Sequence, residues 1–251
     1  MTLEKIKCRL FVDAGLAAGG PVELGPEQSH YLRNVMRLGT GDGVALFNGR
    51  DGEWSAAIGD LGKNRSVMTP ERLLREQVAE PGPWLAFSPL KKARTDFLVE
   101  KATELGVSRL CPVITRHTQS ARVNRDRMQA NAVEAAEQSE RLTVPEIAGP
   151  ETLENLTAGW LSERRLMVLD ETGGGRPIAQ VLSRLRDGNG GKPVETGFLS
   201  GPEGGFDAGE LDALRKLDFV TAVDLGPRTL RAETAALAAL ACWQAVFNAG
   251  K

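Results

Sequence analysis

The sequence predicts an α/β domain with a mainly parallel sheet, preceded by a small β-barrel. Two observations predict this order. Short strand-like runs separated by turns fill residues 1–75, and strand-like and helix-like runs alternate from residue 84 onward. The uncharged "PGPW" at 81–84 marks the linker between these regions. We therefore expect a first domain at 1–76 and a second at 77–251.

The first domain contains several short segments with strand character. "CRLFV" at 8–12 is a strand candidate, and the apolar spacing of "PEQSHYLRNVMRL" at 26–38 predicts a short helix. Further strands are expected at 43–49, 53–61 and 65–74, separated by the turns "GRDG" and "LGKN". We expect these short strands to close into a barrel, because closure leaves no sheet edge with unpaired backbone groups.

In the second domain, apolar runs of strand length alternate with amphipathic runs of helix length. Such alternation predicts parallel strands joined by helices. The expected strands are 84–90, 109–115, 164–170, 195–201 and 219–226, and the expected helices are 93–107, 124–142, 177–187, 207–217 and 232–248.

Composition excludes several classes of protein. The longest apolar run, at 235–247, has thirteen residues, whereas a membrane-spanning helix needs about 20. The amino terminus is charged and has no apolar core, so we expect no signal peptide and a cytoplasmic protein. The three cysteines and two histidines are far apart in sequence, which supports neither a metal site nor a disulfide framework.

The net charge of −2 conceals an uneven distribution of charge. Residues 91–127 hold nine Lys/Arg against four Asp/Glu, whereas residues 128–251 hold twelve against eighteen. A basic block of this kind is typical of a phosphate-binding face. A solvated surface with scattered cations explains the same pattern, and charge alone does not exclude it.

Familiar nucleotide and hydrolase motifs are absent or misplaced. "GTGDG" at 39–43 contains G-x-G-x-G, but a helix-like segment precedes it and a strand follows, which reverses the order of a dinucleotide site. The sequence has no G-x-x-x-x-G-K-[ST] and, around Ser200, no G-x-S-x-G. An NAD-dependent or phosphate-ester enzyme is therefore poorly supported.

The segment "LSGPEGGF" at 199–206 joins a strand to a helix. Its glycines permit positive φ and a close approach of the backbone to a ligand. Asp207 stands at the N-cap position and Glu210 follows three residues later, which predicts a capping box. In an open α/β sheet, ligands bind at the carboxyl ends of strands. A plain structural turn explains this loop equally well when it is taken alone.

A second loop of the same kind follows at 224–234, "DLGPRTLRAET". Arg228 and Arg231 stand at the entrance of the Ala-rich helix that follows it. A cation at a helix amino terminus is electrostatically unfavourable, so these arginines are better explained by an anionic partner. A tightly packed core helix would account for the alanines but not for the arginines.

Together these motifs carry a resemblance that covers nearly the whole chain. "LSGPEGGF" and "LGPRTLRAETAALAAL", preceded by "EKATELGV" and "EAAEQSERLTVPEI", resemble the RsmE family, the 16S rRNA (uridine-N3)-methyltransferases of the SPOUT superfamily. "RLFV" at 9–12 and "H…VMRLGTGD" at 30–42 look like the small PUA-like RNA-binding barrel of this family. The chain departs from the family pattern mildly, with Ala232 where Thr is usual and "VMR" where "VLR" is usual.

The resemblance implies a SPOUT-type methyltransferase domain with a deep trefoil knot, a homodimer, and S-adenosyl-L-methionine as cofactor. It further implies that 16S rRNA or the 30S subunit is the partner and that neither a metal nor a membrane is involved. The cofactor-binding residues would be Leu169, Glu171, Leu199, Ser200, Gly201, Gly204, Gly205, Leu225, Gly226, Leu230 and Arg231. The RNA-binding residues would be Arg9, Arg37, Lys91, Arg94 and Arg116.

For catalysis, methyl transfer to uridine N3 requires loss of an imide proton and stabilisation of the resulting anion. Arg231 is the first candidate for contacting that anion or the adjacent phosphate, and Arg228 is the second. Glu203 is the candidate base, although Glu203 and Glu233 could each equally cap backbone N–H groups. The alternative function is a non-catalytic rRNA-binding or ribosome-assembly factor that keeps the same fold.

Overall fold

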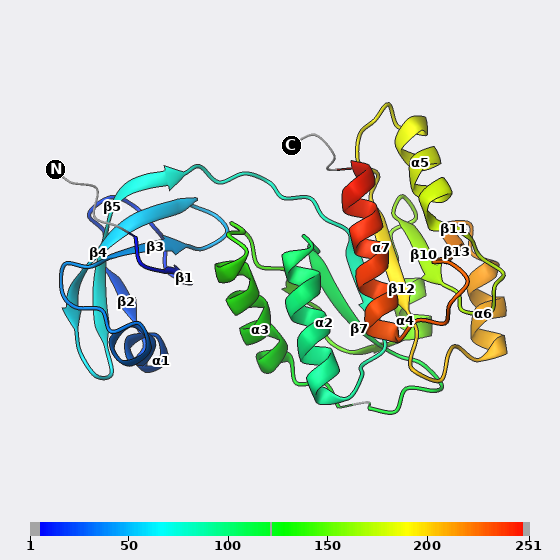
Figure 1. The fold of residues 1–251 in the computed structure, drawn as a ribbon, viewed down its shortest axis with the longest axis horizontal. Helices are drawn as coiled ribbons and strands as arrows, with labels where there is room; N and C mark the ends of the chain where they lie inside the picture. Colours follow the sequence, from blue (N-terminus) through cyan, green and yellow to red (C-terminus); the bar gives the residue numbers. More distant parts are fainter. Residues whose placement is uncertain (1–5, 121, 248–251) are drawn as a thin grey trace. The chain divides into compact units, whose positions relative to one another are not determined.

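The computed structural model describes residues 6–120 and 122–247, and these form two compact units (Figure 1). The first unit comprises the chain up to Glu80 together with Ala136–Val144, and the second comprises Pro81–Ala135 and the chain from Pro145 onward. Division by sequence places 136–144 in the second domain, whereas the contacts of this segment lie within the first unit.

The first unit contains one five-stranded sheet in the order β1-β3-β4-β5-β2. β1 pairs with β3 in parallel and the other pairs are antiparallel. The sheet encloses a core that includes Val44, Leu46, Ile58 and Met68. Of its strands, only β2 has no counterpart in the sequence prediction. The strands are β1 Arg9–Phe11, β2 Val22–Leu24, β3 Gly43–Phe47, β4 Glu53–Leu61 and β5 Ser66–Arg75.

The helix expected at 26–38 is divided into two short parts. α1 covers Pro26–His30 and begins with proline in its first turn, after which η1 continues as π-helix over Tyr31–Val35. The wider turn is visible in the hydrogen bond from Met36 N to Tyr31 O at 2.9 Å. The chain then reverses at Arg37, whose φ of +55° ends the helical segment.

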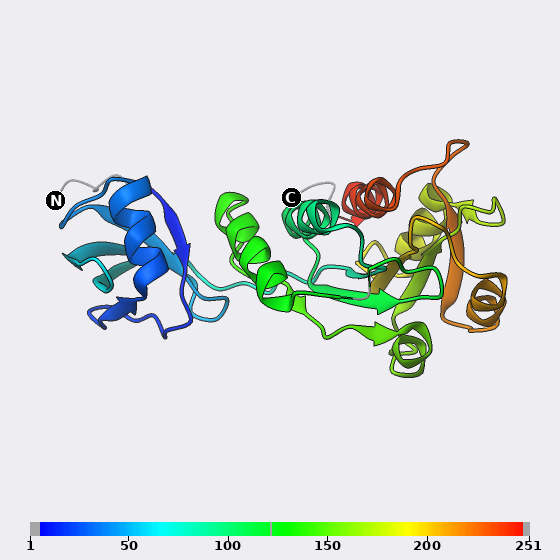
Figure 2. The same cartoon turned by 90° about the horizontal axis from the view of Figure 1, so that it is seen from below.

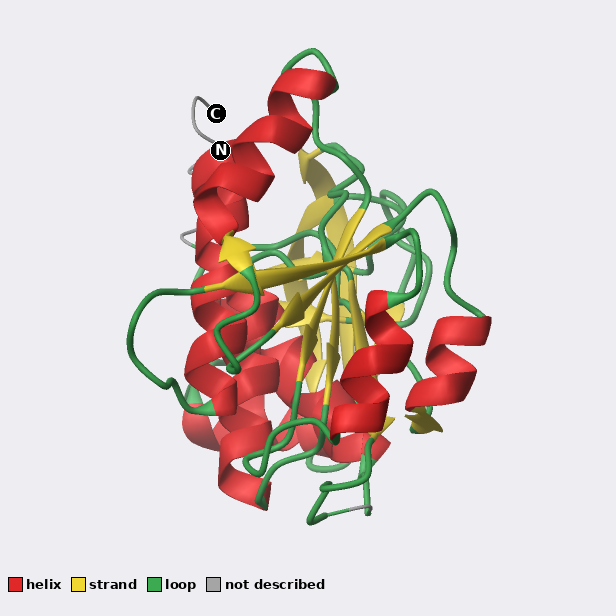
Figure 3. Ribbon diagram, turned by 90° about the vertical axis from the view of Figure 1, so that its right-hand side faces the viewer, coloured by secondary structure: helices red, strands yellow, loops and turns green. Residues whose placement is uncertain are grey.

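The second unit is built on an eight-stranded sheet in which every paired strand is parallel. Its order is β11-β13-β10-β12-β6-β7-β8, with β9 pairing to β7. Figure 3 shows this sheet twisted between helices on both sides. The strands are β6 Trp84–Phe87, β7 Arg109–Ile114, β8 Glu146–Ile147, β9 Glu151–Thr152, β10 Arg165–Leu169, β11 Arg176–Pro177, β12 Thr196–Ser200 and β13 Val220–Asp224.

Helices cover both faces of this sheet, which explains why β12 is buried along its whole length and β10 is buried after Arg165. α4 and α6 pack on one face through Leu153, Leu156, Leu211 and Leu214. α7 lies on the other face, in contact with β12, α2 and α5 (Figures 1 and 2). The helices are α2 Lys92–Glu104, α3 Arg125–Gln138, α4 Leu153–Ala158, α5 Ile178–Gly188, α6 Ala208–Arg215 and α7 Ala232–Phe247.

The predicted α/β architecture is confirmed, and the five strands and five helices expected in the second domain are all present. α4 and the two-residue strands β8, β9 and β11 were not expected, because segments of two to six residues carry too little periodicity. The predicted end of the last helix at 248 lies outside the described residues. The trefoil knot stays a prediction. Among the described residues, no helix is long and apolar enough to cross a membrane.

Candidate functional site

A cavity of about 650 Å³ opens at the carboxyl ends of β10, β12 and β13. Parallel strands end at the same edge of a sheet, so loops distant in sequence meet there. The three loops lining the cavity are 169–173, 200–206 and 223–231. The beginning of α7 and two cations at the start of α2, Lys91 and Arg94, complete the wall.

The loop after β12 approaches its neighbours closely at two glycines. A Cβ on Gly201 would lie 2.8 Å from the Phe206 ring, and a Cβ on Gly205 would overlap the Glu171 carboxylate. Gly205 also has a φ of +70°, in the region that favours glycine. The loop is anchored at its base, where Ser200 Oγ donates to Ala232 O at 3.0 Å. Side chains are excluded there, so the backbone itself forms this wall.

Asp207 and Glu210 form the predicted capping box at the start of α6. Glu210 has a second partner, since its Oε1 accepts from Arg116 N at 2.8 Å. His117 Nδ1 lies 3.1 Å from Gly205 O. The capping residues therefore connect the loop after β12 to the segment after β7, which fixes the far end of the cavity wall.

The loop after β10 is organised by the buried carboxylate of Asp170. This carboxylate accepts from Thr172 N at 2.9 Å, from Thr172 Oγ1 at 2.6 Å and from Arg215 Nη2 at 2.9 Å. Burial would raise the pKa of Asp170, but the hydrogen bonds from Thr172 and Arg215 outweigh it and lower that pKa. Asp170 is therefore a fixed negative charge beside the cavity.

The loop after β13 brings the two predicted arginines to the cavity. It turns at Gly226, which has a φ of +111° and donates its N–H to Asp224 Oδ1 at 2.8 Å. Arg228 and Arg231 both line the cavity and are exposed. Neither side chain forms a hydrogen bond or ion pair with another described residue. Both guanidinium groups are therefore available to an anionic ligand.

Arg94 joins the two motif carboxylates at the edge of the cavity. Its Nη1 donates to Glu203 Oε1, and its Nε lies 3.7 Å from Glu233 Oε1. Glu233 is 8% exposed, and its Oε2 is buried without a hydrogen-bond partner among the described residues. An unsatisfied carboxylate oxygen is costly to bury, which makes this cluster a candidate for ligand contact.

Most of the predicted cofactor and catalytic residues meet at this one cavity. Leu199 does not line the cavity, because its side chain packs in the hydrophobic core between the sheet and helices α4 and α6. Gly204 does not line it either and faces His117. The residues that line it are Leu169, Glu171, Ser200, Gly201, Glu203, Gly205, Leu225, Gly226, Arg228, Leu230 and Arg231.

Sequence reasoning missed several residues of the cavity wall. Asp170 ends the strand predicted at 164–170 and Asp224 begins the loop quoted at 224–234, and this position at a strand end was a usable signal. Phe206 and Thr229 carried no signal, because their role depends on how the loops fold back.

The predicted RNA-binding residues occupy different environments. Lys91 and Arg94 line the cavity. Arg37 is exposed on the first unit and Arg116 on the second.

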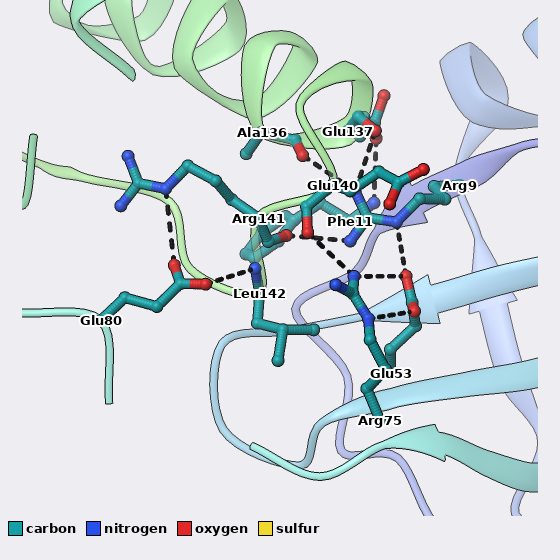
Figure 4. Close-up of polar contacts among 10 residues, drawn as sticks. All are labelled: Arg9, Phe11, Glu53, Arg75, Glu80, Ala136, Glu137, Glu140, Arg141 and Leu142. Carbon is teal, nitrogen blue, oxygen red and sulfur yellow. Dashed lines mark hydrogen bonds and ion pairs between the residues drawn. The ribbon is translucent and has the colours of Figure 1, made fainter. Parts of the chain in front are cut away.

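Arg9 is not available to an external ligand (Figure 4). Its Nε donates to Glu53 at 2.5 Å, Nη1 donates to Ala136 O at 2.9 Å and to Glu137 O at 2.8 Å, and Nη2 donates to Arg141 O at 2.9 Å. Its guanidinium also stacks on the Phe47 ring, 4.3 Å from the centroid. The geometry does not support the predicted RNA contact, because all of these donors are used within the first unit.

Among the described residues, no group of three or more His, Cys, Asp or Glu side chains could hold a metal ion.

Two family models match the chain. An RNA methyltransferase domain matches residues 81–244, and an RNA methyltransferase PUA domain matches residues 24–68. The PUA match falls within the first unit, and the methyltransferase match covers most of the second unit together with residues 136–144 of the first.

Relatives and solved structures agree with these matches. Ribosomal RNA small subunit methyltransferase E of Rickettsia conorii is 33% identical over 93% of both chains. The Neisseria gonorrhoeae protein of that name, solved with S-adenosyl methionine, is 28% identical, with a TM-score of 0.79 over 96% of this chain and 98% of that one. A Legionella pneumophila methyltransferase solved with bound SAM is 25% identical, with a TM-score of 0.81 over 95% and 97%.

Proposed function

Because the chain belongs to the RsmE family of ribosomal RNA small subunit methyltransferases, we propose that it transfers the methyl group of S-adenosylmethionine to N3 of one uridine in 16S rRNA. One observation carries the proposal. A glycine-lined cavity at three strand ends presents two unpaired arginines, Arg228 and Arg231, to the same space.

The cavity fits the cofactor in size and in chemistry. Its volume of about 650 Å³ lies within the range of small-molecule sites. Gly201 and Gly205 lack side chains, which would collide with Phe206 or Glu171, so backbone groups of this loop line the cavity and would contact the cofactor. The carboxylates of Asp170 and Glu171 offset positive charge on the ligand. When bound, S-adenosylmethionine would supply an electrophilic methyl group on a sulfonium.

The chain's own groups would position the uridine and stabilise its anion. Loss of the N3 proton leaves negative charge on the uracil ring, and Arg231 and Arg228 can donate to its oxygens or to the adjacent phosphate. We propose that the carboxylate of Glu203, which lines the cavity, accepts the proton that N3 loses. The ion pair between Glu233 Oε1 and Arg94 Nε, 3.7 Å apart, would hold the Arg94 side chain in position. Together these groups would hold the deprotonated N3 toward the methyl group that the cofactor supplies when bound.

RNA contacts would come from both units. The first unit, which matches an RNA methyltransferase PUA domain, presents Arg37, and the second presents Lys91, Arg94 and Arg116. These cations would hold phosphates and so position the substrate. We further propose a homodimer that acts in the cytoplasm, with the first domain at 1–76 binding RNA and the second at 77–251 carrying the cofactor.

The experiment that tests this function is in vitro methylation of 30S subunits and of naked 16S rRNA, with the nucleosides identified by mass spectrometry. Calorimetry on the same preparation measures S-adenosylmethionine binding. We expect cofactor binding and a single 3-methyluridine. No cofactor binding would contradict the proposal. Binding of rRNA without any methylated nucleoside would favour the non-catalytic ribosome-assembly factor.

A further inference from the structure

A second cavity, of about 400 Å³, lies within the second unit beside β6 and β7. No residue of its lining belongs to the cofactor cavity. It is bounded by the ends of both strands, by the first turns of α2 and α3, and by the segment that enters α3. Its lining is Phe87, Pro89, Leu90, Lys92, Thr95, Asp96, Pro112, Ser120, Arg122, Val123, Asn124, Arg127 and Met128.

The inner wall of this cavity is apolar and rigid. Phe87, Leu90 and Met128 are 1%, 5% and 2% exposed, so the core holds their side chains in place. Pro89 and Pro112 add flat, inflexible surface. Such a wall suits a planar ring that has left water.

The rim of the cavity is cationic. Arg127 forms a two-pronged pair with Asp96, with Nε at 2.8 Å and Nη2 at 2.6 Å, and Asn131 donates to the same carboxylate at 3.0 Å. The hydrogen bonds from Arg127 outweigh burial and lower the pKa of Asp96, so Asp96 stays ionised and fixes Arg127. Lys92 and Arg122 are exposed and form no hydrogen bond or ion pair with another described residue.

The two cavities flank the first turn of α2. Lys91 and Arg94 face the cofactor cavity, whereas Lys92, Thr95 and Asp96 face the second one. This turn carries no acidic residue and has no side-chain cap. Arg94 is paired with Glu203 and Glu233. The side chains of Lys91 and Lys92 form no hydrogen bond or ion pair with another described residue, and unpaired cations at a helix amino terminus are unfavourable unless an anion is near. An α-helix with its side chains is about 10–12 Å across, so one ligand chain can reach both cavities.

We propose that the second cavity binds a nucleotide of single-stranded RNA next to the methylated uridine. Its base would enter the cavity beside the half-buried Val123, over the floor that Phe87, Leu90 and Met128 support, and its phosphate would contact Lys92 and Arg122. An unpaired RNA base is recognised by stacking and by its edges, with cations on the backbone. A free phosphate would use the rim but leave the apolar wall without a role. The inference rests on the proposed function and names a subsite of the same substrate.

The test compares two double variants, each of which removes two positive charges. Lys92→Ala/Arg122→Ala removes the rim cations, and Arg184→Ala/Lys216→Ala removes two exposed cations that line neither cavity. The probe is a fluorescein-labelled single-stranded RNA with the 16S sequence around the methylated uridine, measured by anisotropy at several salt concentrations. We expect the rim variant to raise Kd about tenfold and to lower the slope of log K against log salt by about 0.7, since the one phosphate that both cations contact contributes about 0.7 in single strands.

Base recognition needs a second measurement on the same proteins. Abasic nucleotides are placed one at a time beside the uridine. The wild-type protein should lose affinity at one position, whereas Val123→Trp, which fills the cavity, should bind weakly and be insensitive to that position. If Val123→Trp does not fold, the abasic series on the wild type still tests the site.

The outcomes separate this inference from the proposed function. Cofactor binding should be unchanged in the rim variant, and its KM for 30S subunits should rise while kcat changes little. Equal affinity of the rim variant and the matched control, or no sensitive abasic position, would overturn the inference even if methylation continues. Loss of dimerisation in the rim variant, seen by ultracentrifugation, would also overturn it, because a second copy would then cover the cavity. Absence of methylation in the wild type would instead contradict the proposed function.

Discussion

The same residue type serves opposite purposes in Arg9 and Arg231. Arg9 is surrounded by a carboxylate, an aromatic ring and three backbone carbonyls, whereas Arg231 has no partner among the described residues. Sequence alone predicted an external ligand for both. It could not separate them, because the partners of Arg9 at 136–141 are more than 120 positions away in the chain.

At the residue scale, Arg231→Ala should lower kcat for rRNA methylation about 100-fold or more, as loss of a charge-stabilising donor does. Its fold should persist, because the side chain is exposed. Methyl incorporation into 30S subunits measures the rate, and circular dichroism measures the fold. Arg184→Ala, another exposed arginine, is the control. Full activity of Arg231→Ala would remove this residue from the mechanism.

Asp170 gives a prediction about pH. Its folded-state pKa is lowered, so the unfolded chain binds more protons and the stability from this group is lost as pH falls below about 4. Asp170→Asn should melt at a lower temperature at pH 7, because the donors of Thr172 and Arg215 lose a charged acceptor. It should also lose less stability than the wild type between about pH 5 and pH 3.

Melting temperatures across this range of pH provide the measurement for Asp170. Asp187→Asn, at an exposed ion pair with Arg186, should behave like the wild type. Parallel pH profiles for Asp170→Asn and the wild type would show that Asp170 does not contribute to the acid dependence.

At the scale of elements, the carboxyl end of α3 depends on the β-sheet of the first unit. The last carbonyls of a helix have no partner within it, and the guanidinium of Arg9 supplies donors to those of Ala136 and Glu137. Arg75 adds a hydrogen bond to Glu140 O at 2.9 Å and also holds Glu53 (Figure 4). The helix end is therefore capped by side chains from distant strands.

Arg9→Ala should destabilise the first unit by about 2 kcal/mol, since charged hydrogen bonds to buried acceptors are lost. Amide hydrogen exchange in β4 and β5 measures this free energy. Arg65→Ala, which breaks the exposed pair with Glu23, is the matched control and should cost less than about 1 kcal/mol. Unchanged exchange together with weakened RNA binding in Arg9→Ala would restore the RNA-contact interpretation.

Periodicity predicted the long elements well and the short ones poorly. The buried strand β12 and the Ala-rich helix α7 are close to their predicted bounds because each has a strong local pattern. The π-helical turn of η1 and the two-residue strand β11 depend on neighbours instead. β11, for example, exists only because Pro177 and Arg176 pair with β13.

At the scale of the whole molecule, the cavity that we propose binds the cofactor belongs to one unit. All of its lining residues lie in the second unit, and the motif loops that predicted it are the ones that form it. This part of the site was predictable, because glycine turns at strand ends are local features. The linkage of Arg94 to Glu203 and Glu233 was not, since it joins three elements that only the fold brings together.

S-adenosylmethionine should therefore stabilise one unit more than the other. At 100 times its Kd, a ligand adds about 2.7 kcal/mol, which should raise the melting temperature of the second unit by about 5–10 °C. Differential scanning calorimetry measures both transitions, with ATP as the control ligand. Equal shifts of both transitions would show that the two units unfold as one, and no shift would contradict binding at this cavity.

The grouping of 136–144 with the first unit has a consequence for how the protein is made. The strands of that unit are translated before residue 80, but the carbonyls that engage Arg9 are translated only after the whole of α2 and β7. Glu80 accepts a hydrogen bond from Leu142 N at 3.3 Å, and this bond too can form only after 136–144 has been translated. On the ribosome the first unit begins folding early and finishes late. A gene truncated after codon 80 would therefore encode the five-stranded sheet without the segment that completes its unit.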